Sequence, residues 1–261
     1  MSLDVVLLLV VFLGLAAVAT YLYTLFFRKG AFFKVNGLRL YYVEAGQGTP
    51  VILVHGLAAE HAGNWMLPRV FQRLAKRYRV IALDSRGHGK SDKPYDPAQY
   101  GLELVDDVVR LMDHLGIVKA HVVGYSLGGF ITLKLALRHP ERLLSAAPCG
   151  AGWSANPAEE LKLLFILSED VEQGRGLTAL LNWLWALKKP LPTPVLWFMH
   201  RLTPLFNDMK AICCLLRNSP ALVATEREVR GNVVPCLAIV GGDDRMRLFA
   251  EQLAGAMSSP R

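Results

Sequence analysis

One short motif constrains the fold of this chain more than any other feature. Residues 124–129 read Gly-Tyr-Ser-Leu-Gly-Gly and stand between an apolar run at 121–124 and a helical pattern at 127–137. A strand that turns sharply into a helix requires glycine where side chains would collide, and Gly124 and Gly128 occupy those places. The turn would expose Ser126 at the start of the helix, where the helix dipole and free N–H groups stabilise negative charge. We therefore interpret Ser126 as a nucleophile.

The chain around this motif alternates strand-like and helix-like segments. The pair Asn36-Gly37, between apolar runs at 32–35 and 38–43, predicts a hairpin. Further strands are expected at 51–54, 80–83, 143–147 and 236–240, and helices at 66–78, 102–115 and 247–257. Strands that alternate with helices favour an α/β fold, with a mostly parallel, doubly wound sheet covered on both faces. Residues 151–233 are rich in Leu, Trp and Phe and predict a helical cap inserted over the sheet edge.

The amino-terminal segment is a candidate membrane span. Residues 5–27 contain no charged side chain, and a helix of that length would span roughly 34 Å, against about 30 Å for the hydrocarbon core of a bilayer. Basic residues follow the segment, beginning with Arg28 and Lys29, which places the remainder in the cytoplasm by the positive-inside rule. A cleaved signal peptide is the alternative, because residues 17–19 resemble a cleavage site. We expect a transmembrane anchor at 1–29 and localisation at the membrane.

Composition argues against several other function classes. The 29 Lys and Arg outnumber the 22 Asp and Glu, but they are scattered rather than clustered with aromatic residues, which argues against nucleic-acid binding. The four cysteines show no CxxC spacing, and the His, Asp and Glu residues show no metal-ligand spacing, so no metal site is expected. The sequence contains neither GxGxxG after a strand nor GxxxxGK followed by Ser or Thr, the two glycine-rich motifs that bind nucleotides, and no cofactor is expected.

Four segments together resemble the α/β-hydrolase fold superfamily, in its cap-bearing branch of serine esterases and lipases. They are VILVHG (51–56), LDSRGHGKSD (83–92), VVGYSLGG (122–129) and PCLAIVGGDD (235–244). The resemblance implies a nucleophile elbow at Ser126, with an oxyanion hole formed by the N–H groups of Leu57 and Leu127. His55 and Gly56 would shape that hole. It also implies that 30–150 and 234–261 form the two parts of the core and that 151–233 form the cap.

The same resemblance implies two catalytic partners for Ser126, a carboxylate and a histidine base, and the sequence lacks a histidine at the expected place. The family pattern places the acid at Asp244, with Asp243 as the alternative, and a histidine should follow it. No histidine follows Asp244 in this sequence. We therefore expect a chain truncated before the last strand, the histidine loop and the final helix, which hydrolyses poorly or not at all. His200, within the insertion, is the alternative base.

These inferences combine into one expected function. The chain would be a membrane-anchored serine hydrolase that cleaves carboxylic esters through an acyl-enzyme on Ser126. Its partners would be a small-molecule ester and the lipid bilayer, and the apolar cap together with the anchor favours a lipophilic acyl group. Hydrolysis of amide, peptide, thioester or C–C bonds on the same fold is the enzymatic alternative. A degenerate hydrolase fold that only binds is the non-enzymatic one.

Overall fold

The computed structural model describes residues 12–16, 18–20, 23, 30–177, 180 and 203–257. Most of the predicted anchor at 1–29 lies outside these residues. Within the described part of the chain, no helix has both the length and the apolar character that crossing a bilayer requires. The predicted transmembrane helix is therefore not found there, and this finding overturns the predicted membrane localisation.

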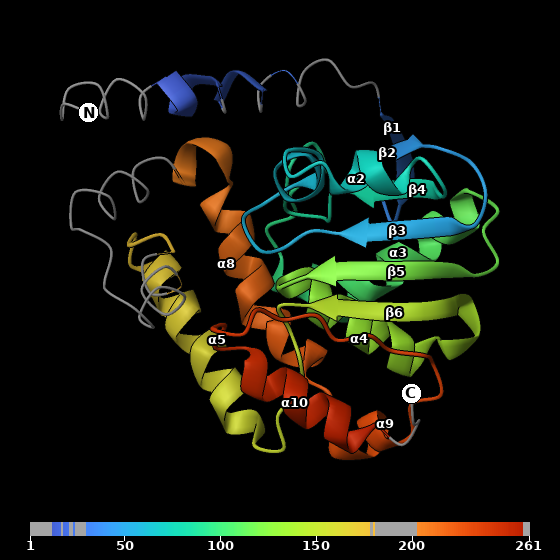
Figure 1. The fold of residues 1–261 in the computed structure, drawn as a ribbon. Helices are drawn as coiled ribbons and strands as arrows, with labels where there is room; N and C mark the ends of the chain where they lie inside the picture. Colours follow the sequence, from blue (N-terminus) through green and yellow to red (C-terminus); the bar gives the residue numbers. More distant parts are fainter. Residues whose placement is uncertain are drawn as a thin grey trace, which may run out of the picture.

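Six strands form one sheet in the order β1-β2-β4-β3-β5-β6 (Figure 1). They are β1 (Ala31–Val35), β2 (Leu38–Ala45), β3 (Pro50–Val54), β4 (Arg79–Leu83), β5 (Ala120–Tyr125) and β6 (Leu143–Cys149). Strands β1, β2 and β4 pair antiparallel, whereas β4, β3, β5 and β6 run parallel. Asn36 and Gly37 join β1 to β2 with positive φ angles of 47° and 82°, as a tight hairpin turn requires. The mostly parallel sheet is thus confirmed.

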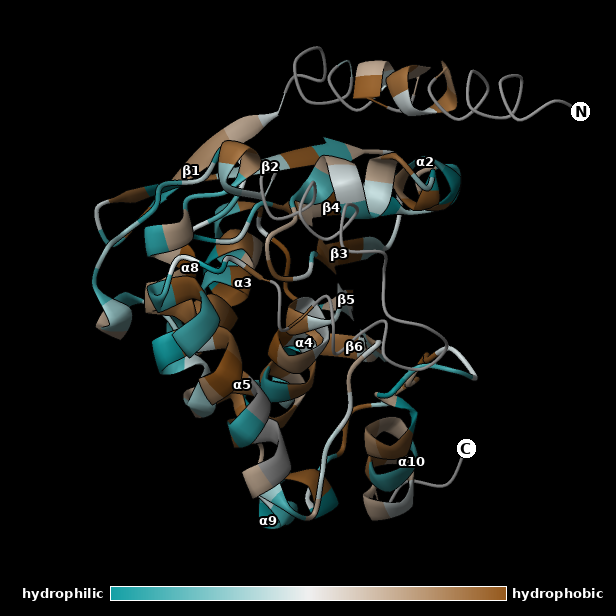
Figure 2. Ribbon diagram, turned by 90° about the vertical axis from the view of Figure 1, so that its left-hand side faces the viewer, coloured by the Kyte–Doolittle hydropathy of each residue, from teal (hydrophilic) through white to brown (hydrophobic). Residues whose placement is uncertain are grey.

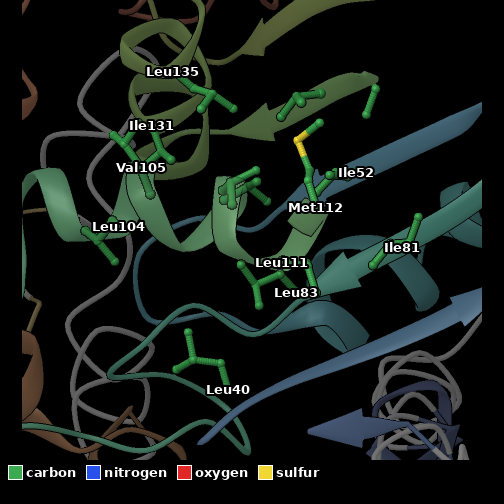
Figure 3. Close-up of a cluster of buried hydrophobic side chains, with 14 of the residues drawn as sticks. Leu40, Ile52, Ile81, Leu83, Leu104, Val105, Leu111, Met112, Ile131 and Leu135 are labelled. Atoms are coloured by element: carbon green, nitrogen blue, oxygen red, sulfur yellow. The ribbon is translucent and has the colours of Figure 1, made fainter. Parts of the chain in front are cut away.

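The central strands are buried on both faces because their apolar residues are continuous. Ile52 and Val54 pack on the face that carries α3 (Leu102–His114) and α4 (Leu127–Arg138). Val51 and Leu53 pack on the opposite face, with α2 (Val70–Leu74). Figure 3 shows the first of these clusters, in which side chains from the sheet meet those of α3 and α4. The prediction of helices on both faces of the sheet is confirmed.

Two predicted elements differ from the structure. The helix expected at 66–78 is reduced to the short α2, and its first residue, Met66, instead ends a π-helix, η1 (Ala62–Met66). Pro68 cannot continue a helix, and Arg69 adopts a positive φ of 64°, so the chain changes direction between them. The strand expected at 236–240 is present only as two isolated bridges to β6, Ala146–Cys236 and Cys149–Ile239.

The described residues of the predicted cap form helices near the carboxyl ends of the parallel strands. They are α5 (Pro157–Glu172), α8 (Met209–Asn218) and η4 (Ser219–Leu222). The helix α9 (Glu226–Arg230) lies away from these strand ends, where Val229 packs with Leu133 of α4 and with Leu253. Helices α5 and α8 pack together through a cluster that includes Leu167, Ile212 and Leu216, and Leu57 packs against it. Figure 1 places α5 and α8 beside the arrowheads of β3, β5 and β6, and Figure 2 shows both hydrophilic and hydrophobic residues on them. The helix α10 (Arg247–Ala256) agrees with the expected helix at 247–257.

Candidate active site

Ser126 occupies a strained turn between β5 and α4. Its backbone angles are φ 51° and ψ −114°, in a region that residues with a Cβ rarely adopt. Its N–H donates to Cys149 O at 2.8 Å, and its carbonyl accepts from Gly129 N at 2.8 Å. These two hydrogen bonds hold the turn between the end of β6 and the first turn of α4. The serine side chain therefore stands at the carboxyl edge of the sheet and lines a cavity there.

The glycines of the motif allow this turn because backbone segments meet at each of them. A methyl group at Gly124 would overlap the carbonyl oxygen of Gly128. At Gly128, the same addition would overlap Val54 O. Helix α4 can thus approach β3 and β5 directly, and this close packing sets the position of Ser126.

The loop after β3 presents one free backbone donor beside the serine. Gly56 N donates to Asn64 Oδ1 at 2.7 Å, and Ala58 N donates to His88 Nε2 at 3.1 Å. Between them, the N–H of Leu57 donates no hydrogen bond within the described residues. The N–H of Leu127, the first residue of α4, likewise donates none there. Both residues line the cavity beside Ser126.

His55 and His88 are buried and use both ring nitrogens in the fold. His55 Nε2 accepts from Ser85 N at 3.0 Å, and Nδ1 lies 2.8 Å from Gly56 O. An Nε2 that accepts a backbone N–H carries no proton, so His55 is neutral and donates through Nδ1. Burial lowers the pKa of His55 and lowers that of His88 to about 3. These rings tie the loop after β3 to the loop after β4, and neither lines the cavity.

Asp244 lines the same cavity as Ser126, whereas Asp243 does not. Asp244 Oδ1 accepts from Met246 N at 2.9 Å, and Oδ2 would lie 3.9 Å from a Cβ placed on Gly150. No histidine belongs to the described lining of the cavity. His200 lies outside the described residues, so its predicted alternative role as base stays a prediction. The predicted truncation of the chain also stays a prediction.

The cavity has a volume of about 290 Å³, and most of its wall is apolar. The core side contributes Gly56, Leu57, Ala59, Asn64, Tyr125, Ser126, Leu127, Phe130, Gly150, Asp244, Met246 and Phe249. The opposite side contributes Leu164, Leu167, Leu180, Leu216, Ser219, Leu222 and Val223. Asn64 is one of the lining residues that sequence reasoning did not single out, because no motif or spacing distinguishes it from an ordinary loop asparagine.

Comparison with known proteins agrees with this geometry. The family described as the alpha/beta hydrolase fold matches residues 49–180, which include the turn at Ser126 and the loops after β3 and β4. The chain belongs to this family. The assignment confirms the resemblance on which the site residues were predicted, while their individual roles stay predictions.

Several relatives are enzymes that act on carbonyl compounds. The chain is 39% identical over 141 residues to a 2-hydroxy-6-oxononadienedioate/2-hydroxy-6-oxononatrienedioate hydrolase of Comamonas testosteroni, an alignment that covers 51% of this chain and 49% of the relative. The chain thus spans about half the length of the curated relatives it matches.

Two solved structures match over most of both chains. The first is an enol-lactonase of Burkholderia xenovorans, with a TM-score of 0.69 at 26% identity over 87% of this chain and 88% of that one. The second is a meta-cleavage product hydrolase of Pseudomonas fluorescens, with a TM-score of 0.63 at 25% identity over 88% and 86%. Both structures therefore share the fold of this chain over most of its length.

Proposed function

We propose that this chain carries the active site of a serine hydrolase that cleaves a C–C bond next to a carbonyl in a small, largely apolar compound. Ser126 Oγ attacks the carbonyl carbon, and the N–H groups of Leu57 and Leu127 bind the oxygen that becomes negative. The C–C bond then breaks, its electron pair takes up a proton, and water hydrolyses the acyl-enzyme on Ser126 to a carboxylic acid. The curated relatives of known C–C bond chemistry support this bond type over an ester.

The observation that carries the proposal is the surroundings of Ser126. A hydroxyl on a strained turn faces an apolar cavity, and two backbone N–H groups there have no acceptor among the described residues. A free N–H is ordinary at the start of a helix, but Leu57 lies on a separate loop and both residues line the cavity that Ser126 lines. Preorganised donors of this kind stabilise a developing oxyanion by about 3–4 kcal/mol each.

The base is the part of the mechanism that the described residues do not supply. Ser126 needs a group that removes its proton, and the proposal gives Asp244, which lines the same cavity, the role of orienting that group. Free imidazole is small enough to enter a cavity of about 290 Å³ and carries the same ring as histidine. We therefore expect imidazole to increase turnover by this chain.

Ester hydrolysis is the second candidate, and the enol-lactonase likeness favours it specifically. A lactone carbonyl would meet Ser126 in the same way as a ketone, but the leaving atom would be oxygen instead of carbon. The two candidates therefore differ in the group that departs and not in the attacking serine.

Turnover of matched substrates tests both candidates. The chain would be assayed with 2-hydroxy-6-oxononadienedioate and with a p-nitrophenyl ester of a short acyl chain, each with and without imidazole. Rates are taken above those of imidazole without protein, because imidazole itself hydrolyses p-nitrophenyl esters. Turnover that depends on imidazole and disappears in Ser126→Ala supports the role of the serine, and turnover of the dienedioate supports C–C cleavage whatever the rate of the activated ester. Turnover that Ser126→Ala leaves unchanged would refute the role of the serine.

A further inference from the structure

Asn64 presents an amide group to the cavity in a fixed orientation. Its Oδ1 accepts from Gly56 N at 2.7 Å. Because a backbone N–H must face an acceptor, this hydrogen bond places the amide oxygen toward Gly56 and the NH₂ group on the other side. Nδ2 donates no hydrogen bond to any described residue, although Asn64 lines the cavity. The amide therefore has two unused donors.

The backbone around Asn64 is held as firmly as its side chain. Asn64 lies in the π-helix η1, and its N–H donates to Glu60 O at 3.1 Å. The next two residues, Trp65 and Met66, are buried in the core on the α2 face of the sheet. Single π-helical turns interrupt the normal hydrogen-bond ladder and occur frequently at functional sites. The Asn64 amide is consequently preorganised before any ligand arrives.

Asn64 is connected to the nucleophile elbow through Gly56. Its partner Gly56 approaches the elbow so closely that a Cβ there would lie 3.4 Å from Ser126 Cβ. Another polar residue of the wall, Ser219, differs in this respect, because its hydroxyl already donates to Leu215 O at 2.9 Å. Asn64 and Ser126 thus line one cavity, and the Nδ2 donors of Asn64 have no partner among the described residues.

We propose that Asn64 determines specificity by donating from Nδ2 to a second oxygen of the substrate, separate from the carbonyl that Ser126 attacks. This inference rests on the proposed function and narrows its substrate class to acyl compounds that carry a further keto, hydroxyl or carboxylate oxygen. A monofunctional ketone or ester would leave the NH₂ group unpaired in a largely apolar cavity. The amide would therefore discriminate between substrates of equal size.

Ligand binding tests this inference without any turnover. Octan-2-one would be compared with octane-2,5-dione and octane-2,6-dione by titration monitored by NMR, because these ligands have the same chain length and differ in one oxygen. A net hydrogen bond corresponds to about a three- to ten-fold difference in Kd. We expect at least one dione to bind the unmodified chain tighter than octan-2-one by that factor.

Two substitutions separate the donor from its structural partner. Asn64→Asp keeps an oxygen for Gly56 N–H and replaces the NH₂ group with a second oxygen, so the preference for the dione should fall below two-fold while the fold is retained. Asn156→Asp is the matched control, because Asn156 caps α5 away from the cavity and aspartate caps equally well. It should leave the preference unchanged.

The outcomes are distinct from those of the turnover assay. Equal affinity of the unmodified chain for octan-2-one and both diones would overturn the inference, as would a preference that persists in Asn64→Asp. Either result would leave the attack by Ser126 unaffected. Conversely, a dione preference that depends on Asn64 would stand even if no C–C bond or ester were cleaved.

Discussion

Gly128 and Val54 are in direct backbone contact, since a methyl group on Gly128 would overlap Val54 O. Neither backbone can retreat, because α4 and β3 are both buried at this point. We expect Gly128→Ala to lower the free energy of unfolding by about 1–3 kcal/mol or more. Gly255→Ala in α10 is the control, because nothing lies within 4 Å of a Cβ there and alanine favours a helix. Urea denaturation of both variants measures the contrast, and an equal loss in both would contradict the contact.

The strain at Ser126 should be measurable separately from its chemistry. Its φ of 51° penalises any residue with a Cβ, and glycine removes the penalty. We expect Ser126→Gly to exceed Ser126→Ala in free energy of unfolding by about 1 kcal/mol, whereas neither variant reacts as a nucleophile. Chemical denaturation of the two variants gives the difference. A more stable alanine variant would show that the turn relaxes without the hydroxyl.

Stability should decrease with acid before the carboxylates titrate. Burial lowers the pKa of His88 to about 3, whereas an unfolded histidine titrates near pH 6.5. Between these values the unfolded chain binds a proton that folded His88 does not, so the free energy of unfolding falls as the pH falls. Each such histidine lowers the free energy of unfolding by at most about 1.4 kcal/mol for each unit by which the pH falls. Burial also lowers the pKa of His55, so His55 acts in the same direction.

The variant His88→Gln isolates this contribution. Glutamine does not titrate, so the decline in unfolding free energy between about pH 6.5 and pH 4.5 should be shallower by roughly one proton. Above pH 6.5 the slopes of the two proteins should coincide. Denaturant titrations across this range measure both slopes, and parallel curves below pH 6.5 would show that His88 accepts a proton in the fold.

A buried ion pair supports the loop after β4. Arg86 and Asp107 are each 1% exposed and form two hydrogen bonds, of 2.7 and 2.6 Å. We expect Asp107→Asn to cost about 3–5 kcal/mol, because it leaves a buried guanidinium without its full counter-charge. The exposed pair Arg247–Glu251 is the control, and Glu251→Gln should cost about 0.5 kcal/mol or less. Thermal or urea denaturation compares them, and similar costs would contradict the importance of burial.

Local signals in the sequence were sufficient to predict most of the core. The runs at 51–54 in β3 and 80–83 in β4 are apolar without interruption, and strands buried on both faces require that pattern. The π-helix η1 was not predictable, because it depends on tertiary packing of Trp65 and Met66. The break after it carried a signal in Pro68 that the helical spacing of the neighbouring residues obscured.

Part of the candidate site could also be predicted from the sequence. The elbow at Ser126 and the loops beside it were predicted from motifs. Close backbone approach requires glycine at these positions, and glycine is visible in the sequence. The orientation of Asn64 could not be predicted, because it depends on a hydrogen bond from Gly56 N–H that only the folded chain forms. The strand expected at 236–240 likewise depends on long-range pairing with β6, which is reduced to two bridges.

The two halves of the cavity wall come from different parts of the chain. Atoms that would react lie on turns of the sheet, whereas the leucines opposite them belong to α5, α8 and η4. Substitutions of those leucines would change the shape of the cavity, and they would also touch the site, because Leu57 packs against the α5–α8 cluster and Leu127 shares a core cluster with Leu222. During evolution, such substitutions change which molecules fit the cavity, while the serine and the backbone groups of the turns are inherited unchanged.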